Sequence, residues 1–185
     1  MTSVRDQGVG DYLRALASTA AVPGGGSAAA LSAAMGAALL SMVAKLSARK
    51  ARSAEARSAL EAVVPELDRL TDQLLTLSQD DVDAYRAVIE ARKSGGDDGS
   101  LARSNVRAAE VPLATASAAH RAVTLADEVS RHAWDMVASD LAAGNRLLQA
   151  GLDGALANVA INLPDLRGDD AARIDAAYRK LMNRR

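Results

Sequence analysis

The sequence has no cysteine and no phenylalanine, and aromatic residues make up only 2% of it. Without cysteine the chain can form neither a disulfide nor a thiolate metal site, and its two histidines, His120 and His132, are too few for a multi-histidine site. We therefore expect no bound metal. A core with so few aromatic residues must consist mainly of Ala, Leu, Val, Ile and Met, which favours closely packed helices over a β-sheet.

The charge balance excludes further classes of protein. The net charge is -1 and the isoelectric point is about 6.1, whereas a dedicated nucleic-acid-binding domain usually carries a clear basic excess. The first residues, 1–11, contain charged side chains and no apolar segment, so they do not resemble a signal peptide. We expect a cytoplasmic protein that does not bind nucleic acid.

Residues 27–46 form an almost uncharged run that is nearly long enough to cross a membrane. Ala, Ser and Gly dominate this run and provide little hydrophobic driving force, so we expect no membrane association. A helix that is apolar on all sides is more often a buried central helix or an oligomer interface. Small residues four positions apart, such as Ser32 and Gly36, would allow a partner helix to approach closely, and we expect these residues to form a homodimer interface.

Helical periodicity continues along the chain, with no strand-like alternation and no internal repeat. Pro65 and Pro112 should each kink or split a helix, and the glycine-rich residues 95–99 should form an exposed turn. The sequence therefore predicts one all-α domain over residues 1–185, a bundle of five to seven helices. The expected helices cover residues 11–20, 27–46, 54–94, 101–130, 134–162 and 170–183.

An acidic residue occupies a position where the helical pattern requires an apolar one. Apolar residues recur at alternating steps of four and three along the third expected helix, and Asp81 is the next residue in this register. The apolar residues of this seam are Val63, Leu67, Leu70, Leu74 and Leu77, followed after Asp81 by Ala84, Val88 and Ala91. Burial would raise the pKa of the Asp81 carboxyl towards neutrality, as general acid/base catalysis requires. Alternatively, the helix ends near Ser78 and Asp81 caps a new helix in solvent.

Three further groups of residues are candidates for ligand binding, and each has a purely structural alternative. Free amides at a helix start favour anions, basic side chains bind carboxylates, and Asn side chains both donate and accept hydrogen bonds. The alternatives are a tight turn, a solvated surface, and close helix packing with satisfied Asn side chains. The three groups are Gly24, Gly25, Gly26 and Ser27; Lys45 and Arg49; and Asp140, Asn158 and Asn162.

Three segments, in order, resemble the cyclodeaminase domain of the formiminotransferase-cyclodeaminase family. The first, residues 11–46, contains Pro-Gly-Gly-Gly-Ser followed by an Ala-rich helix and Met-Val-Ala-Lys-Leu. The second, residues 80–91, resembles the acidic segment around the family's catalytic aspartate. The third, residues 139–163, resembles the late Ser-Asp and Asn-Val-Ala-Ile-Asn-Leu segment.

The resemblance implies a compact helical dimer that acts on the one-carbon unit of tetrahydrofolate without a cofactor. Asp81 matches the catalytic aspartate, with Asp80 the alternative if the match shifts by one residue. The resemblance implies a cyclodeaminase reaction, and relatives that are short separate chains hydrolyse 5,10-methenyltetrahydrofolate. Because the chain is too short to hold a fused transferase domain, we expect first the hydrolysis of 5,10-methenyltetrahydrofolate to 10-formyltetrahydrofolate. The alternatives are a 5-formiminotetrahydrofolate cyclodeaminase, which releases ammonia, and a folate-binding dimer that has lost catalysis.

The chain departs from the family pattern at three places, which puts the choice of substrate in question. Tyr85 replaces the usual Phe. Residues 92–95, Arg-Lys-Ser-Gly, stand where the family commonly has Leu-Pro-Lys, and residues 136–138, Met-Val-Ala, stand where it often has Gly-Asn.

Overall fold

The computed structural model describes residues 3–94 and 98–183, which form six α-helices and three short 3₁₀ helices with no strand. The predicted all-α bundle of five to seven helices is confirmed. The α-helices are α1 (Val9–Leu16), α2 (Gly25–Lys50), α3 (Ala54–Lys93), α4 (Asp98–His132), α5 (Ala138–Asn162) and α6 (Gly168–Met182). The 3₁₀ helices are η1 (Val4–Asp6), η2 (Asp135–Val137) and η3 (Leu163–Asp165). The turn predicted over residues 95–99 falls largely outside the described residues.

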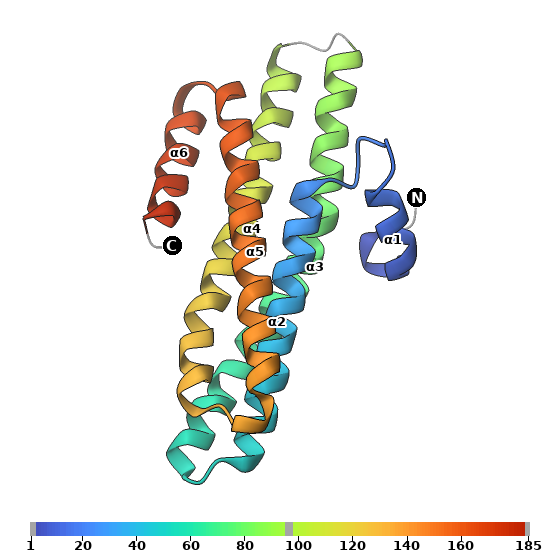
Figure 1. Ribbon diagram of the computed structural model, residues 1–185. Coiled ribbons are helices and arrows are strands. Elements are labelled where there is room, and N and C mark those ends of the chain that lie inside the picture. Colours follow the sequence, from blue (N-terminus) through green and yellow to red (C-terminus); the bar gives the residue numbers. More distant parts are fainter. Residues whose placement is uncertain (1–2, 95–97, 184–185) are drawn as a thin grey trace.

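Helices α2 to α5 form an antiparallel four-helix bundle, in which each helix packs against its two neighbours (Figure 1). The short helix η1 packs against α3, and Tyr12 of α1 contacts Ser27 in the first turn of α2. Helix α6 packs against α4 and α5 near the end of α5 (Figure 1). Because consecutive helices alternate in direction, the starts of α2 and α4 and the ends of α3 and α5 meet at one end of the bundle. That end carries the candidate site.

Helix α2 is the central helix, and its small residues allow α5 to pack closely against it. A Cβ on Gly36 would lie 2.8 Å from the Gly144 carbonyl oxygen, and a Cβ on Gly151 would lie 2.7 Å from the Ala29 carbonyl oxygen. Gly144 and Gly151 therefore accommodate a neighbouring helix rather than a ligand. By length and composition α2 could span a membrane, but 61% of its most apolar window is buried in the bundle, as expected for a core helix.

Helix α3 covers the predicted residues without interruption. Ser53 begins it by accepting a hydrogen bond from the Ala56 N–H, and the helix then continues through Pro65 to Lys93. The missing N–H of Pro65 leaves the Glu61 carbonyl without a helical partner, and both residues are exposed, so that water can satisfy this carbonyl. Pro65 therefore does not split the helix, and the entire predicted apolar seam is buried.

Helix α4 also continues without a break through its proline, Pro112, which is buried. Here the carbonyl that loses its helical donor is that of Ala108, four residues earlier. The side-chain amide of Asn162 replaces the missing donor, since its Nδ2 atom donates to the Ala108 oxygen at 3.0 Å. Pro112 therefore does not split the helix, and α5 supplies the hydrogen bond that the proline cannot make.

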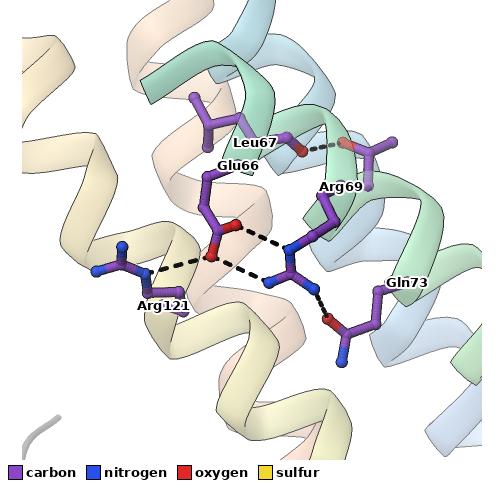
Figure 2. Close-up of polar contacts among 6 residues, drawn as sticks. Glu66, Leu67, Arg69, Gln73 and Arg121 are labelled. Carbon is purple, nitrogen blue, oxygen red and sulfur yellow. Dashed lines mark hydrogen bonds and ion pairs between the residues drawn. The ribbon is translucent and has the colours of Figure 1, made fainter. Parts of the chain in front are cut away.

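A surface network connects α3 to α4 towards the opposite end of the bundle. Figure 2 shows Glu66 between Arg69, which donates to it at 2.8 Å, and Arg121 of α4, whose Nε lies 3.5 Å away. Arg69 also donates to Gln73 at 3.0 Å. The hydrogen bond from Arg69 is the main cause that holds the pKa of Glu66 below its ordinary value. Such an exposed network orients two helices but adds little stability.

Candidate active site

A cavity of about 360 Å³ opens at the end of the bundle where α2 begins. Four helices of the bundle and the segments that flank them contribute its walls, which combine polar backbone, amide and carboxylate groups with apolar side chains. The residues that line it are Ala21, Val22, Gly24, Gly25 and Gly26; Asp81, Ala84, Tyr85 and Arg92; Ala108; and Asn158, Ile161, Asn162 and Asp165. The predicted glycine turn, Asp81 and the two Asn residues thus meet at one site.

Asp81 lies on the inner wall of this cavity, at the position where the seam of α3 faces the start of α2. Burial raises the pKa of its carboxyl above the ordinary value of 3.8, and a hydrogen bond from the Ser27 backbone lowers it only in part. The helix does not end near Ser78, so the alternative of a solvent-exposed cap at Asp81 does not hold. The arrangement provides a partly desolvated carboxyl beside an open space.

The two neighbouring carboxylates point away from the cavity. Asp80 lies 3.8 Å from Arg107 of α4, and Asp83 is exposed and accepts a hydrogen bond from Gln79 at 2.9 Å. Neither residue lines the cavity, so the geometry favours Asp81 over Asp80 as the acid/base candidate.

Gly26 is a glycine because the Asp81 side chain occupies the space where a Cβ would lie. Such a Cβ would be 2.6 Å from the Asp81 Cγ and 2.9 Å from its Oδ2, and closer still to Oδ1. Among the described residues only Gly168 has a positive φ, so the turn at Gly24 to Gly26 does not need glycine for its backbone conformation. The turn instead allows Asp81 to approach the backbone of α2.

Ser27 is held in place by a buried network of hydroxyl groups. The Tyr12 hydroxyl donates to Ser27 Oγ at 3.1 Å, and Ser27 Oγ lies 2.8 Å from Ser78 Oγ, which also bonds to the Ser27 carbonyl at 3.1 Å. Burial raises the pKa of the Tyr12 hydroxyl. The hydrogen bond to Ser27 lowers this pKa in part, and the nearby Asp81 carboxyl raises it further. This network was not predicted from the sequence, because it joins α1, α2 and α3. It fixes the first turn of α2 against Asp81.

The start of α2 has no side-chain cap, so the N–H groups of its first turn depend on other partners. The Ser27 N–H is directed to Asp81, whereas Gly25 and Gly26 line the cavity. An oxygen atom of a bound molecule would find amide donors and the positive end of the helix dipole here.

Asn158 and Asn162 form the wall contributed by α5, and both use their amide nitrogens within the protein. Asn158 Nδ2 donates to the Gly154 carbonyl at 2.8 Å, and Asn162 Nδ2 donates to the Asn158 carbonyl at 2.8 Å as well as to that of Ala108. Both Asn side chains are therefore hydrogen-bonded within the protein, which agrees with the structural alternative of close helix packing with satisfied Asn side chains. The same donations orient the two side chains at the cavity wall.

The outer rim of the cavity contains residues that the sequence did not single out for binding. Tyr85 and Ile161 are 46% and 75% exposed, and Arg92 Nη2 lies 3.2 Å from Asp165 Oδ2. Asp81, Tyr85 and Arg92 are separated by four and seven residues, which places them on one face of α3. This spacing would have revealed Tyr85 and Arg92 once Asp81 had been chosen as the reference position.

The structure does not bring Lys45, Arg49 and Asp140 to this cavity. Lys45 pairs with Asp68 at 2.9 Å, and Lys45 and Arg49 both line surface clefts near the other end of α2. Lys45 follows Gly26 by 19 helical residues, which corresponds to about 28 Å. The prediction that these residues share one site with Asp81 does not hold within a single chain.

Asp140 is separated from the cavity for the same geometric reason. It lies in the first turn of α5, whereas Asn158 lies 18 residues later, about 27 Å along the helix axis. Asp140 and Asn158 share a helix but cannot contact one small ligand. In the described part of the chain, no group of three or more His, Asp or Glu side chains could hold a metal ion.

The sequence of the chain also matches a known protein family. The chain matches the formiminotransferase-cyclodeaminase family over residues 8–181, and it belongs to that family. The family predicted from the three sequence segments is confirmed.

Two relatives and one solved structure show how far the similarity extends. The methenyltetrahydrofolate cyclohydrolase of Methylorubrum extorquens is 34% identical, over 92% of this chain and 85% of that protein. The formimidoyltransferase-cyclodeaminase of Gallus gallus is 31% identical, over 85% of this chain but only 31% of its own length. The formiminotetrahydrofolate cyclodeaminase from Thermotoga maritima superimposes with a TM-score of 0.83 over 97% of this chain and 96% of that chain. At 22% identity, this last comparison shows the shared fold alone.

Proposed function

We propose that this chain is a 5,10-methenyltetrahydrofolate cyclohydrolase in which Asp81 is the acid/base. The observation that carries the proposal is the Asp81 carboxyl, which burial gives a raised pKa beside a cavity lined by amide groups. The similarity to a cyclohydrolase of which the chain covers 85% supports this reaction in particular.

The chemistry needs one carboxyl group that first accepts and then returns a proton. The Asp81 carboxylate accepts a proton from water as the water oxygen bonds to the methenyl carbon between N5 and N10. The tetrahedral adduct then collapses: its C–N5 bond breaks, a carbonyl forms on N10, and the Asp81 carboxylic acid returns the proton to N5. The hydroxyl proton of the adduct leaves to solvent. A raised pKa suits both steps, because the group must change its protonation state twice.

The remaining wall residues would bind and orient the substrate. The Gly25 and Gly26 amides would donate to an oxygen of the pterin or of the adduct, and the side chains of Asn158 and Asn162 would face the heterocycle. We propose that the reaction needs neither metal nor cofactor and takes place in the cytoplasm.

A second candidate reaction uses the same residues. A 5-formiminotetrahydrofolate cyclodeaminase would close the ring by attack of N10 on the formimino carbon and would release ammonia. Relatives named formimidoyltransferase-cyclodeaminase support it. The formimino group reacts in its protonated form, so that attack of N10 leaves an amino group on the adduct. Asp81 would accept the proton of N10 and deliver it to this amino group, which leaves as ammonia as the C–N bond breaks.

The test is an absorbance assay that follows the near-ultraviolet band of 5,10-methenyltetrahydrofolate, with a buffer blank for spontaneous hydrolysis. Wild type should accelerate the loss of the band, Asp81→Asn should not, and the matched control Asp80→Asn should retain activity because Asp80 lies outside the cavity. Full activity of Asp81→Asn would show that the assignment is wrong. If wild type is inactive on this substrate, ammonia release from 5-formiminotetrahydrofolate tests the second reaction. Folate binding without either turnover would establish the non-catalytic alternative.

We also propose that the chain forms a homodimer through α2. Most of the predicted interface residues are buried within the chain, but Met35 and Met42 are 53% and 37% exposed, with the exposed Ala38 between them. These three residues form one stripe at helical spacing. Light scattering at micromolar concentration should give the mass of a dimer, and a monomer mass would contradict the proposal.

A further inference from the structure

Helix α3 presents a line of three side chains that leads from the inner wall of the cavity to its rim. Asp81 stands at the inner end, Tyr85 follows one turn later, and Arg92 stands at the outer end. Eleven residues separate Asp81 from Arg92, which corresponds to about three turns and about 16 Å of helix. The Asp81 and Arg92 side chains therefore lie on the same helix face, and both line the cavity.

The spacing of this line corresponds to the dimensions of a folate. In that molecule a p-aminobenzoyl group and an amide bond separate the reacting carbon from the carboxylates of the glutamate, a length of about three extended residues or roughly 10 Å. A reacting carbon beside the short Asp81 side chain would place the carboxylates within reach of the longer Arg92 side chain. The aromatic linker would then lie beside Tyr85, a residue that is 46% exposed.

Charge supports the same orientation. Arg92 is the only cationic side chain among the described residues that line the cavity. Its side chain is 57% exposed, and its guanidinium contacts Asp165 at 3.2 Å. A guanidinium has five donors in a planar fork and binds a carboxylate through two parallel hydrogen bonds. A ligand carboxylate would bind there in addition to Asp165 or in its place.

We infer that Arg92 binds the glutamate carboxylates of the substrate and so fixes its orientation, with the reacting carbon at Asp81 and the tail at the rim. The inference rests on the proposed function and makes it more specific. It also assigns to Arg92 the role that the sequence had suggested for Lys45 and Arg49, which lie near the far end of α2.

The test compares two ligands that differ only in the tail. One is 5,10-methenyltetrahydrofolate, and the other is an analogue whose glutamate is replaced by an uncharged N-methylamide. Arg92→Gln should raise KM for the glutamate form by about tenfold and leave kcat unchanged. This factor is at the low end of the effect of losing a hydrogen bond to a charged group, because the site is exposed. KM for the amide analogue should be the same for wild type and Arg92→Gln.

Lys93→Gln is the matched control, since it removes the same charge from the same last turn of α3 and does not line the cavity. It should leave both KM values unchanged. An equal rise in KM for both ligands in Arg92→Gln, or no rise for either, would overturn the inference.

Equilibrium binding separates this inference from the proposed reaction. Calorimetric titration of wild type and Arg92→Gln with tetrahydrofolate and with its N-methylamide analogue requires no turnover. A selective loss of affinity for tetrahydrofolate in Arg92→Gln supports the role of Arg92 even if wild type hydrolyses nothing. Equal affinity of both proteins for tetrahydrofolate, or no binding by wild type, would contradict it.

Discussion

Replacement of Gly26 by alanine tests whether the position of Asp81 determines activity. The new Cβ would lie 2.6 Å from the Asp81 Cγ and 2.9 Å from Oδ2, and these together with Oδ1 are the three nearest atoms. An ordinary contact is more than 3.4 Å, so the carboxyl must move by about 1 Å. Because Gly26 is buried in the first turn of α2, the backbone cannot easily move instead.

The expected effects on activity and stability differ in size. A displacement of about 1 Å in a catalytic group reduces the rate by about 100-fold. Overpacking of this kind destabilises a protein by about 1–3 kcal/mol. In an Asp81→Ala background the clashing atoms are absent, so Gly26→Ala should cost almost nothing or should stabilise by about 0.5–1 kcal/mol through helix propensity. The two substitutions should therefore be strongly coupled.

The assay is the loss of methenyltetrahydrofolate absorbance, together with urea unfolding of the four proteins in the double-mutant cycle. Gly25→Ala is the comparison, since its Cβ would meet only Asn158 Nδ2, at 3.5 Å. It should reduce activity far less than Gly26→Ala does. The reasoning is refuted if Gly26→Ala retains wild-type activity, or if its cost in stability is the same with and without the Asp81 carboxyl.

Three further predictions concern stability. Burial raises the pKa of Asp81 above 3.8, so the folded protein binds more protons than the unfolded chain above that pH, and stability falls as the pH rises through this window. Asp81→Asn should therefore raise the urea midpoint at pH 7 but not at pH 3.5, and an equal midpoint at pH 7 would contradict this. Asn162→Ala should destabilise by about 1–3 kcal/mol, because it leaves the Ala108 carbonyl unpaired. The cost should be clearly smaller in a Pro112→Ala background, which restores the helical N–H, and equal costs in both backgrounds would exclude this explanation. Gly151→Ala should lower the free energy of unfolding by about 1–3 kcal/mol and so lower the urea midpoint, since its Cβ would lie 2.7 Å from the backbone of α2. An unchanged midpoint would show that α5 can move away from α2 at little cost.

The sequence alone determined that the protein is all-α and that Asp81 marks the site. Helical periodicity depends on neighbours three and four residues apart, so the seam of α3 and the anomaly at Asp81 could be identified without tertiary information. The seam is buried in the structure, and Asp81 lies on its line at the cavity. Gly24 to Ser27 was identified by composition, although the reason for Gly26 was space for Asp81 rather than a turn conformation.

Only the tertiary structure decided which of the candidate residues meet. Lys45 and Asp140 were plausible by residue type, but Lys45 lies about five turns along α2 from Gly26, and Asp140 lies about five turns along α5 from Asn158. Pro112 was expected to break a helix, and a donor from Asn162, 54 residues away from Ala108, prevents this. Periodicity specifies the face of a helix on which a residue lies. The distance between residues on different helices depends on the direction and register of the packed helices, and these arise only when the bundle assembles.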